Sequence, residues 1–377
     1  MKKEIAIVVN GLYGGGAERV LQVFLANFDR QKYDITVINH KEEDILYDFY
    51  PRDINYKSIL KNTEKEEFKI VQLWNRIYNK VNVFVYENFS PRIYRLLYLR
   101  KKFDVEIAFI EGYATRIVSG GRSQKKIAWV HIDLKLYPWT DIAFRSKEEQ
   151  KKSYASFNKV VSVSQSVKKS VEELFPCKSV VIYNPIDSEE IRRTSTCFTV
   201  EREQKPLLFV SVGRLVPQKG YDRLIPIIGK LVAGGANLRL WIVGEGTERK
   251  HLEVLIRKWK LEQVVKLWGY QSNPYPYIKA ADWFVLSSRY EGYGLVVAES
   301  LILETPVISV NCAEMEHLLG KNNNWGMIVD NEEDALHDEM KKIVENKELT
   351  TEYTARAKKG SNRFLLQKQL DEIYSII

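Results

Sequence analysis

The chain has 377 residues, more than one hydrophobic core usually organises, so two domains are expected. Hydrophobic residues make up 45% of it and charged residues 28%, which is typical of a globular protein and excludes disordered and fibrous classes. No apolar run approaches the roughly 20 residues that a membrane-spanning helix needs. The net charge of +8 lies in the first half: residues 1–180 carry 31 Lys and Arg against 22 Asp and Glu, and residues 181–377 carry 26 against 27. This asymmetry suggests an anionic partner such as a membrane surface, a phosphate group or nucleic acid.

The N-terminus, "MKKEIAIVVN", has the basic start and short apolar run that a signal peptide also shows. A glycine-rich loop follows directly and no small-residue cleavage pattern is present, so the run is predicted to be a first β-strand. Further strand and helix patterns follow in the first half at residues 17–28, 33–39, 104–110, 125–131, 159–166, 167–175 and 178–184. Between them, residues 61–102 are basic and aromatic and are predicted to be helical.

The second half is more regular. Residues 188–206 are polar and lack periodicity, which predicts a domain linker. Beyond it, strands are predicted at residues 207–213, 238–246, 264–270, 283–288, 306–311 and 326–330, with helices at 221–235, 247–260, 275–281, 295–304, 313–320 and 333–347. Apolar strands without alternation, joined by helices, indicate parallel sheets covered on both faces. The chain is therefore predicted to be an α/β protein with two Rossmann-like, doubly wound domains, at residues 1–187 and 207–362.

Three cysteines, Cys177, Cys197 and Cys312, show no spacing typical of a metal site and leave one unpaired. They are predicted to be free thiols in a reducing cytoplasm, and no metal site is predicted.

Ligands of open parallel sheets collect at the carboxyl ends of the strands, where the unusual residues of this sequence fall. The first such loop, "NGLYGGGAERV", places Gly15 and Gly16 between the first strand and its helix. Glycine lets the backbone approach a ligand closely, and the N-terminus of a helix offers free N–H groups to an anion. The loop lacks the G-x-G-x-x-G spacing of dinucleotide-binding proteins, and a plain tight turn remains an alternative.

Two loops of the second half carry charged residues. "SVGRLVPQKGYDRL" holds Arg214 and Lys219, whose planar fork and point charge both suit phosphate oxygens. "SSRYEGYGLVVAES" holds Glu291 before a glycine-containing turn and Glu299 within the helix that follows. A carboxylate accepts two hydroxyl hydrogen bonds, so a polyol is a natural partner. For each of these residues taken alone, a solvated surface charge or a helix-end charge remains the alternative.

The segments "SVGRL", "QKG", "VGEG" and "SSRYEGYGLVVAESL", in this order and spacing, resemble the C-terminal domain of glycosyltransferase family 4. Members of that family are retaining nucleotide-sugar transferases of the GT-B fold, in which two Rossmann-like domains face a central cleft. The resemblance is strong over residues 207–330 and is supported by "GGGAERV" and "WVHID". Elsewhere in the first half it is faint.

The resemblance implies roles for matching positions of the second domain. Arg214 and Lys219 would neutralise the donor diphosphate and stabilise the leaving nucleotide. Glu299 would hydrogen-bond the ribose, and Glu291 would hold the transferred sugar. Further donor contacts would come from Gly244 and Gly246, Gly269 and Tyr270, and the backbone of Gly292, Tyr293, Gly294 and Leu295.

Three positions of the first domain match the family as well. Gly15 and Gly16 would approach the diphosphate across the cleft, and His131 would face the sugar near the reacting centre. The alternative for His131 is a structural histidine whose hydrogen bonds are made within the core. Glu18 is left open between a charge in the first turn of a helix and a site residue.

The reaction that the resemblance implies needs neither a metal nor a bound cofactor, because Arg, Lys and helix N-termini supply the positive field. The donor would be a nucleoside-diphosphate hexose or N-acetylhexosamine, with UDP expected and GDP or ADP left open. The acceptor would be a hydroxyl of a growing cell-surface glycan on a polyprenyl carrier, which places the protein in the cytoplasm, peripherally at the inner face of the membrane.

Other function classes fit less well. A non-catalytic partner of another transferase would be expected to lose Arg214, Lys219 or one of the two glutamates, and all four are present. The G-x-G-x-x-G fingerprint of a dinucleotide-dependent oxidoreductase is absent from the loop after the first predicted strand. Epimerases and phosphorolytic enzymes share the fold, but no pyridoxal-lysine context is recognisable. No nucleic-acid-binding module appears either.

Two expectations concern particular segments. The last helix, at about residues 363–377, should pack back on the first domain, as the family's fold implies, through its apolar stripe. Residues 90–103, "SPRIYRLLYLRKKF", mix basic residues with leucines and aromatics and are expected to dock on an anionic membrane. A surface helix whose apolar side packs on the core is the alternative for residues 90–103.

Overall fold

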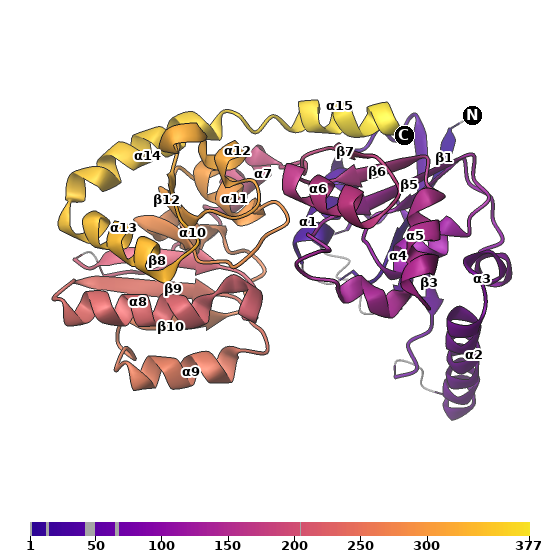
Figure 1. The fold of residues 1–377 in the computed structure, drawn as a ribbon, viewed down its shortest axis with the longest axis horizontal. Helices are drawn as coiled ribbons and strands as arrows, with labels where there is room; N and C mark the ends of the chain where they lie inside the picture. Colours follow the sequence, from indigo (N-terminus) through magenta and orange to yellow (C-terminus); the bar gives the residue numbers. More distant parts are fainter. Residues whose placement is uncertain (1, 13–14, 42–49, 65–67, 204) are drawn as a thin grey trace. The chain divides into compact units, whose positions relative to one another are not determined.

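The computed structural model describes residues 2–12, 15–41, 50–64, 68–203 and 205–377. They form two compact units, one of residues 1–185 with 367–377 and one of residues 186–366 (Figure 1). Each unit is built on one parallel β-sheet with helices on both faces, so the predicted α/β class with two doubly wound units is confirmed. Tyr13 and Gly14 of the first glycine-rich loop lie outside the described residues.

The first unit has a seven-stranded sheet of order β3-β2-β1-β4-β5-β6-β7. Its strands are β1 (Lys3–Val9), β2 (Tyr33–Lys41), β3 (Asn55–Leu60), β4 (Val105–Ala108), β5 (Lys125–Val130), β6 (Lys159–Ser162) and β7 (Ser179–Val181). Residues 5–9 of β1 are all buried, because helices cover both faces of the sheet. The direction of winding reverses between β1 and β4, so the loops after these two strands are neighbours at the carboxyl edge.

The helices of the first unit are α1 (Gly16–Asn27), α2 (Lys69–Asn88), α3 (Pro91–Tyr98), α4 (Tyr113–Ser119), η1 (Trp139–Ala143), α5 (Lys147–Ala155), α6 (Gln165–Leu174) and α15 (Leu366–Ile376). Serine side chains cap α5 and α6, where Ser146 accepts from the amide of Glu149 and Ser164 from that of Val167. The helical character predicted for residues 61–102 is confirmed over α2 and α3.

The C-terminal helix α15 belongs to the first unit (Figure 1). Leu370 and Ile373 are buried on its inner side. The Tyr374 hydroxyl accepts from the amide of Asp29 at 3.0 Å, and its ring stacks on that of Tyr33 with the centroids 5.7 Å apart. These contacts hold the C-terminal helix against Asp29 and Tyr33, which lie more than 300 residues earlier in the chain.

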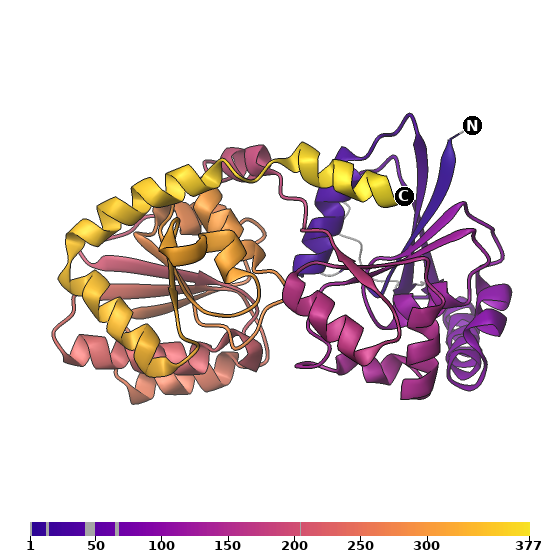
Figure 2. The same cartoon turned by 45° about the horizontal axis from the view of Figure 1, so that its top comes forward.

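The second unit has a six-stranded sheet of order β10-β9-β8-β11-β12-β13, and Figure 2 shows helices on both of its faces. Its strands are β8 (Leu207–Val212), β9 (Leu238–Val243), β10 (Val265–Gly269), β11 (Trp283–Leu286), β12 (Val307–Val310) and β13 (Met327–Val329). Its helices are α7 (Ser188–Thr194), η2 (Pro217–Lys219), α8 (Tyr221–Ala233), α9 (Arg249–Lys258), α10 (Tyr275–Ala280), α11 (Leu295–Ile302), α12 (Met315–Leu319), η3 (Lys321–Asn323), α13 (Glu333–Glu345) and α14 (Lys347–Ser361).

The structure differs from the expected linker over residues 188–194, which form α7 within the second unit. The Asp187 side chain caps this helix by accepting from the amide of Glu190. Acidic residues occupy its first turn and basic residues its last, which complements the helix dipole. Ile191 is its one buried side chain, too little to give the periodic apolar pattern by which a helix is predicted.

Within the described ranges, no helix has both the length and the hydropathy that crossing a bilayer requires.

Candidate active site

The loops after β8 and β11 lie side by side in the second unit, because the strand order reverses between these two strands. Several hydrogen bonds join them. The Ser287 hydroxyl donates to the carbonyl of Lys219 at 2.9 Å, the amide of Arg289 to the carbonyl of Gln218 at 2.8 Å, and the Gln218 side chain to the carbonyl of Tyr290 at 3.0 Å. The two loops, which were considered separately in the sequence, therefore pack against each other.

Gly220 permits this close contact. Its φ of 66° lies in the left-handed region, and a Cβ at this position would clash with the carbonyl oxygen of Ser287. The glycine in "QKG" thus serves the packing of one loop against the other, and it holds the preceding Lys219 beside the β11 loop.

Lys219 and Glu291 form a salt bridge within this pair of loops. The Lys219 Nζ atom lies 2.7 Å from Glu291 Oε1, and the Ser288 hydroxyl donates to the same oxygen at 2.6 Å. Glu291 is only 8% exposed. Its Oε2 atom accepts no hydrogen bond from the described residues, so one carboxylate oxygen is fixed and the other is available to a ligand.

Arg214 lies on the same loop as Lys219 but is exposed. Its guanidinium makes no hydrogen bond or ion pair with any residue that the structure describes. The site therefore holds one cation neutralised by a carboxylate and a second that retains its full charge for an anion.

Glu299 lies on α11, which begins after Gly294 in the left-handed region with a φ of 93°. Glu299 is 8% exposed, and its Oε1 atom accepts a hydrogen bond of 3.0 Å from the hydroxyl of Tyr275, the first residue of α10. Tyr275 was not predicted as a site residue, because a tyrosine at the start of a helix matches no motif. Its contact with Glu299 spans 24 residues and exists only in the folded unit.

Gly244 and Gly246, after β9, pack against the loop after β8. A Cβ at Gly244 would clash with the carbonyl oxygen of Gly213, and one at Gly246 with that of Leu215. The amide of Gly244 also donates to the carbonyl of Gly269 at 2.9 Å, which joins the loop after β10 to the same group. Next to it, Tyr270 is 56% exposed at the rim. Both glycines are thus explained by loop packing, and the loops after β8, β9, β10 and β11 form one continuous edge.

A second group of polar residues lies at the carboxyl edge of the first unit's sheet. The Asn10 side chain bridges the loops after β1 and β4: it donates to the carbonyl of Glu111 at 2.7 Å and accepts from the amide of Ala114 at 2.9 Å. The buried Glu111 carboxylate accepts from the amide of His131 at 2.9 Å. Burial raises the pKa of the Glu111 carboxyl. Glu111 was not predicted, although its place directly after a buried strand was a signal that could have found it.

His131 follows β5, with its ring 5.2 Å from that of Phe109 and 6.2 Å from that of Trp129. Desolvation lowers the pKa of His131 to about 4, against the opposing effect of a hydrogen bond to the Phe109 backbone, so the imidazole is neutral at pH 7. The Nε2 atom is buried and has no hydrogen-bond partner among the described residues. In a neutral imidazole one ring nitrogen donates and the other accepts, so the ring can form a hydrogen bond of either kind.

Gly15 precedes α1, and Gly16 is its first residue. A Cβ at Gly15 would clash with the Glu18 carboxylate, which folds back over the start of its own helix. The helix N-terminus favours this negative charge, so the structure leaves both interpretations of Glu18 in place.

The structure thus brings Arg214, Lys219, Glu291 and Glu299 to one edge of the second unit, and Gly15, Gly16 and His131 to one edge of the first. In neither group, nor elsewhere in the described residues, do three His, Cys, Asp or Glu side chains gather as a metal ion would require.

Two family models match the chain in succession. "Glycosyltransferase Family 4" matches residues 14–190 and "Glycosyl transferases group 1" matches residues 194–360. A curated relative from Campylobacter jejuni, N-acetylgalactosamine-N,N'-diacetylbacillosaminyl-diphospho-undecaprenol 4-alpha-N-acetylgalactosaminyltransferase, is 30% identical over 190 residues, or 50% of each chain. The poly(ribitol-phosphate) alpha-N-acetylglucosaminyltransferase of Staphylococcus aureus is 26% identical over 200 residues, 50% of this chain and 41% of that protein. The chain spans about half the length of these relatives or less.

Solved structures resemble the chain over nearly its whole length. The crystal structure of HepE from Anabaena, in complex with UDP and glucose, has a TM-score of 0.73 at 18% identity. The match covers 99% of this chain and 98% of the HepE chain. The crystal structure of TarM has a TM-score of 0.76 at 13% identity, and the match covers 100% of this chain and 99% of the TarM chain. These likenesses agree with the predicted architecture of two Rossmann-like units.

Proposed function

The chain belongs to the GT-B glycosyltransferases of family 4, and we propose that it transfers a sugar from a nucleoside diphosphate to a glycan hydroxyl. The donor is a UDP-linked hexose or N-acetylhexosamine, and the configuration at the anomeric carbon is retained. The observation that supports this most directly is the group formed by Arg214, the Lys219–Glu291 pair and Glu299 at the point where the second sheet reverses its winding.

The donor diphosphate is held by the two cations. The exposed Arg214 guanidinium offers a bidentate fork to the phosphate oxygens, and Lys219 adds a point charge beside it. As the bond between the anomeric carbon and the diphosphate breaks, the electron pair leaves with the phosphate oxygen. The two cations and the first amides of α11 stabilise the charge that develops there.

The sugar and the ribose are held by the two glutamates. Glu291 Oε1 is held by Lys219 and Ser288, so its Oε2 atom is oriented to accept a sugar hydroxyl. Glu299, fixed by Tyr275, accepts the ribose hydroxyls. The acceptor hydroxyl attacks the cationic sugar from the face that the diphosphate leaves, and the departing phosphate takes up the proton. The neutral imidazole of His131 is assigned to a further hydrogen bond with a sugar hydroxyl.

The acceptor is a growing cell-surface glycan on a lipid carrier. Two observations support this: the names of the relatives from C. jejuni and S. aureus include a diphospho-undecaprenol carrier and a poly(ribitol-phosphate) chain, and the first half of this chain carries the whole net positive charge. A phosphate-containing acceptor suits that charge. Such a protein would work in the cytoplasm at the inner face of the membrane.

A thermal-shift screen of nucleotides tests the proposal. Binding to the folded state raises stability by about 2.7 kcal/mol when the ligand is present at a hundred times its dissociation constant. UDP and one UDP-sugar should raise the unfolding midpoint, whereas NAD and pyridoxal phosphate should not. A shift with NAD and none with any nucleoside diphosphate would overturn the assignment.

A further inference from the structure

The outward face of α2 carries a row of large apolar side chains. Its members are Ile70, Leu73, Trp74, Ile77, Val81 and Phe84, and all are exposed. Trp74 is 66% exposed and Phe84 59%. Their spacing of three and four residues places them on one side of the helix. We name this set the apolar row.

Two asparagines of α2 are engaged by the protein instead. The Asn79 side chain pairs with the backbone of Lys61, accepting from its amide at 2.9 Å and donating to its carbonyl at 2.7 Å. Asn82 is buried and accepts from the Tyr94 hydroxyl at 2.7 Å. The buried side of α2 is short, with Asn82, Val85 and Tyr86, whereas the exposed side carries the apolar row. An exposed row of this kind is unusual for a helix in water and suits an apolar partner.

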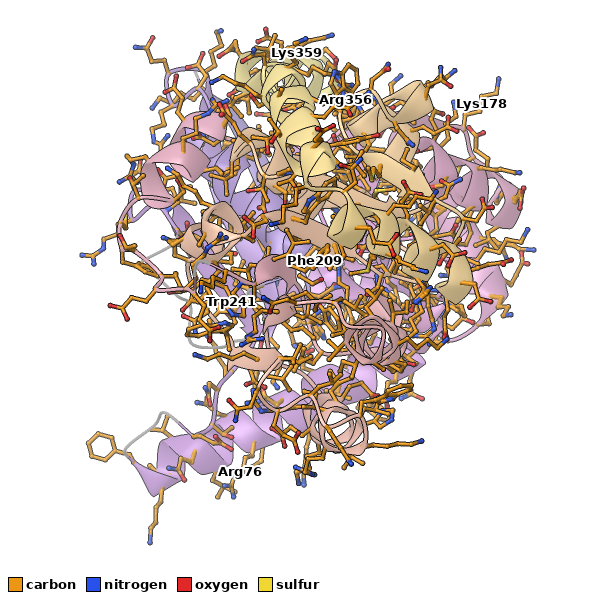
Figure 3. The ribbon with its side chains drawn as sticks, turned by 90° about the vertical axis from the view of Figure 1, so that its left-hand side faces the viewer. Arg76, Lys178, Phe209, Trp241, Arg356 and Lys359 are labelled. Carbon is orange, nitrogen blue, oxygen red and sulfur yellow. The ribbon has the colours of Figure 1, made fainter. Side chains whose placement is uncertain are left out.

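Basic residues flank the apolar row. Residues 69–103 contain eight Lys or Arg and one Asp or Glu. Arg76, Lys80 and Arg92 are exposed, and none of them forms an ion pair with a residue that the structure describes. Figure 3 labels Arg76 on a stretch of α2 that no other ribbon overlies.

The neighbouring helix α3 also exposes apolar side chains, Ile93, Leu96 and Leu97, which are each between 42% and 47% exposed. Arg95, counted in the sequence among the basic residues for a membrane, is instead buried and paired with Glu106 at 3.0 Å. It belongs to the core, because the aromatic side of α3 packs there through Tyr94. Of the basic residues expected at residues 90–103, Arg95 is therefore not available to a membrane, whereas Arg92 is exposed.

We propose that the apolar row and its basic flank dock the first unit onto an anionic lipid bilayer. The helix lies in the plane of the interface, with the apolar row among the acyl chains and Arg76, Lys80 and Arg92 at the lipid phosphates. A second copy of the chain fits less well, since a two-fold contact through the row would place the unpaired cations of the two copies against each other. The docking does not depend on sugar transfer, so its failure would leave the proposed function standing.

Cosedimentation of the full chain with vesicles tests the proposal. Vesicles of phosphatidylcholine with phosphatidylglycerol should bind the protein, and phosphatidylcholine alone should bind it far more weakly. Replacing Arg76, Lys80 and Arg92 with Gln should lower the partition coefficient about a hundredfold, at about fivefold for each residue. The same change at Lys230, Lys347 and Lys359, exposed basic residues of the second unit, is the matched control and should leave binding unchanged.

The apolar row is tested separately by Trp74→Ser, Ile77→Ser and Phe84→Ser combined. This variant should lose binding even at low salt, whereas Phe198→Ser, Val254→Ser and Leu365→Ser combined should not. Circular dichroism should show both variants folded, because all six side chains are exposed.

Trp74 also reports insertion directly, since the other seven tryptophans are buried or half-buried. Brominated lipids should quench part of the emission of the wild type, and Trp74→Phe should bind equally with that quenching lost. Equal binding to neutral vesicles, or retention of binding by the apolar-row variant, would overturn the proposal. So would a dimer in light scattering that becomes monomeric only in the apolar-row variant.

Discussion

Glu291 and Glu299 are both buried carboxylates at one edge of the second sheet, but their partners differ. Glu291 shares one oxygen between a cation and a hydroxyl, and Glu299 accepts from a tyrosine. The first is assigned to the sugar that becomes cationic, and the second to a ribose that does not change. Only an interaction that strengthens toward the transition state raises turnover. Substitutions of the two residues should therefore have different effects on kcat and KM.

Glu291→Gln should lower kcat more than it raises the KM for the donor, because it removes a charge from beside the cationic sugar. A lost contribution of about 3 kcal/mol corresponds to roughly a hundredfold in rate. Glu299→Gln should mainly raise the KM and weaken the binding of UDP alone. Steady-state kinetics of both variants decide the matter, and transfer within twofold of wild type in both would show that the site is misplaced.

Tyr275→Phe should act through Glu299 without touching the reacting atoms. Loss of a hydrogen bond worth about 1 kcal/mol should weaken UDP binding about fivefold and leave kcat nearly unchanged. Tyr277→Phe is the matched control, because the Tyr277 hydroxyl makes no hydrogen bond to the described residues. Calorimetric titration with UDP measures both variants, and an equal loss in the two would assign the effect to packing rather than to Glu299.

The sequence predicted the charged members of this site because they follow apolar strands in a specific order. It did not predict Ser288 as a partner of Glu291, Tyr275 as a partner of Glu299, or Glu111 as a partner of His131. Each of these contacts depends on side-chain direction or on elements distant in sequence, and neither leaves a periodic signal. The pairing of Lys219 with Glu291, 72 residues apart, was missed for the same reason.

Periodic apolar patterns predicted most strands and helices, but β3, α4, α5, α7 and α14 were not predicted. The helix α7 has a single buried side chain and depends on its cap and its tertiary contacts, since so short a helix has little stability of its own. The helix α2 was predicted as a helix, but the pattern could not tell which of its faces is buried.

The helix α15 should contribute strongly to the stability of the first unit. Deleting residues 367–377 removes the buried Leu370 and Ile373 and uncovers the rings of Phe24 and Tyr33. Burial of two such side chains is worth about 3 kcal/mol or more, so the unfolding midpoint should fall by several degrees. Lys368→Ala, an exposed change on the same helix, should leave it unaltered. Calorimetry that finds the deleted chain as stable as the full one would contradict the role given to this helix.

For the molecule as a whole, two half-buried histidines of the first unit, each with a buried ring nitrogen, should make stability depend on pH. Burial lowers the pKa of His40, and likewise that of His131, to about 4, below the ordinary value of 6.5. As the pH falls, these histidines therefore take up protons at a higher pH in the unfolded chain than in the folded chain. The free energy of unfolding should be steady above about pH 6.5 and fall as the pH drops toward 4.

His40→Phe tests this dependence, because the ring of His40 stacks on Tyr113 at 4.8 Å and its Nδ1 atom has no partner in the described part of the chain. Between pH 6.5 and 4 the variant should lose less stability than the wild type. His251→Phe, at an exposed position, should follow the wild type. Identical thermal midpoints for wild type and His40→Phe at every pH would contradict the assignment.

The loops after β8 and β11 of the second unit are proposed to bind a nucleoside diphosphate. Calorimetric titration of UDP into the full chain tests this binding most directly, with Arg214→Ala and Lys219→Ala combined as the site variant. Lys347→Ala and Lys359→Ala combined serve as the control of equal charge. The wild type and the control should bind UDP alike, and the site variant should bind at least about a hundredfold more weakly, since each charged hydrogen bond contributes about 1.5 kcal/mol or more. Failure of the wild type to bind any nucleoside diphosphate, or equal binding by the site variant, would contradict the account.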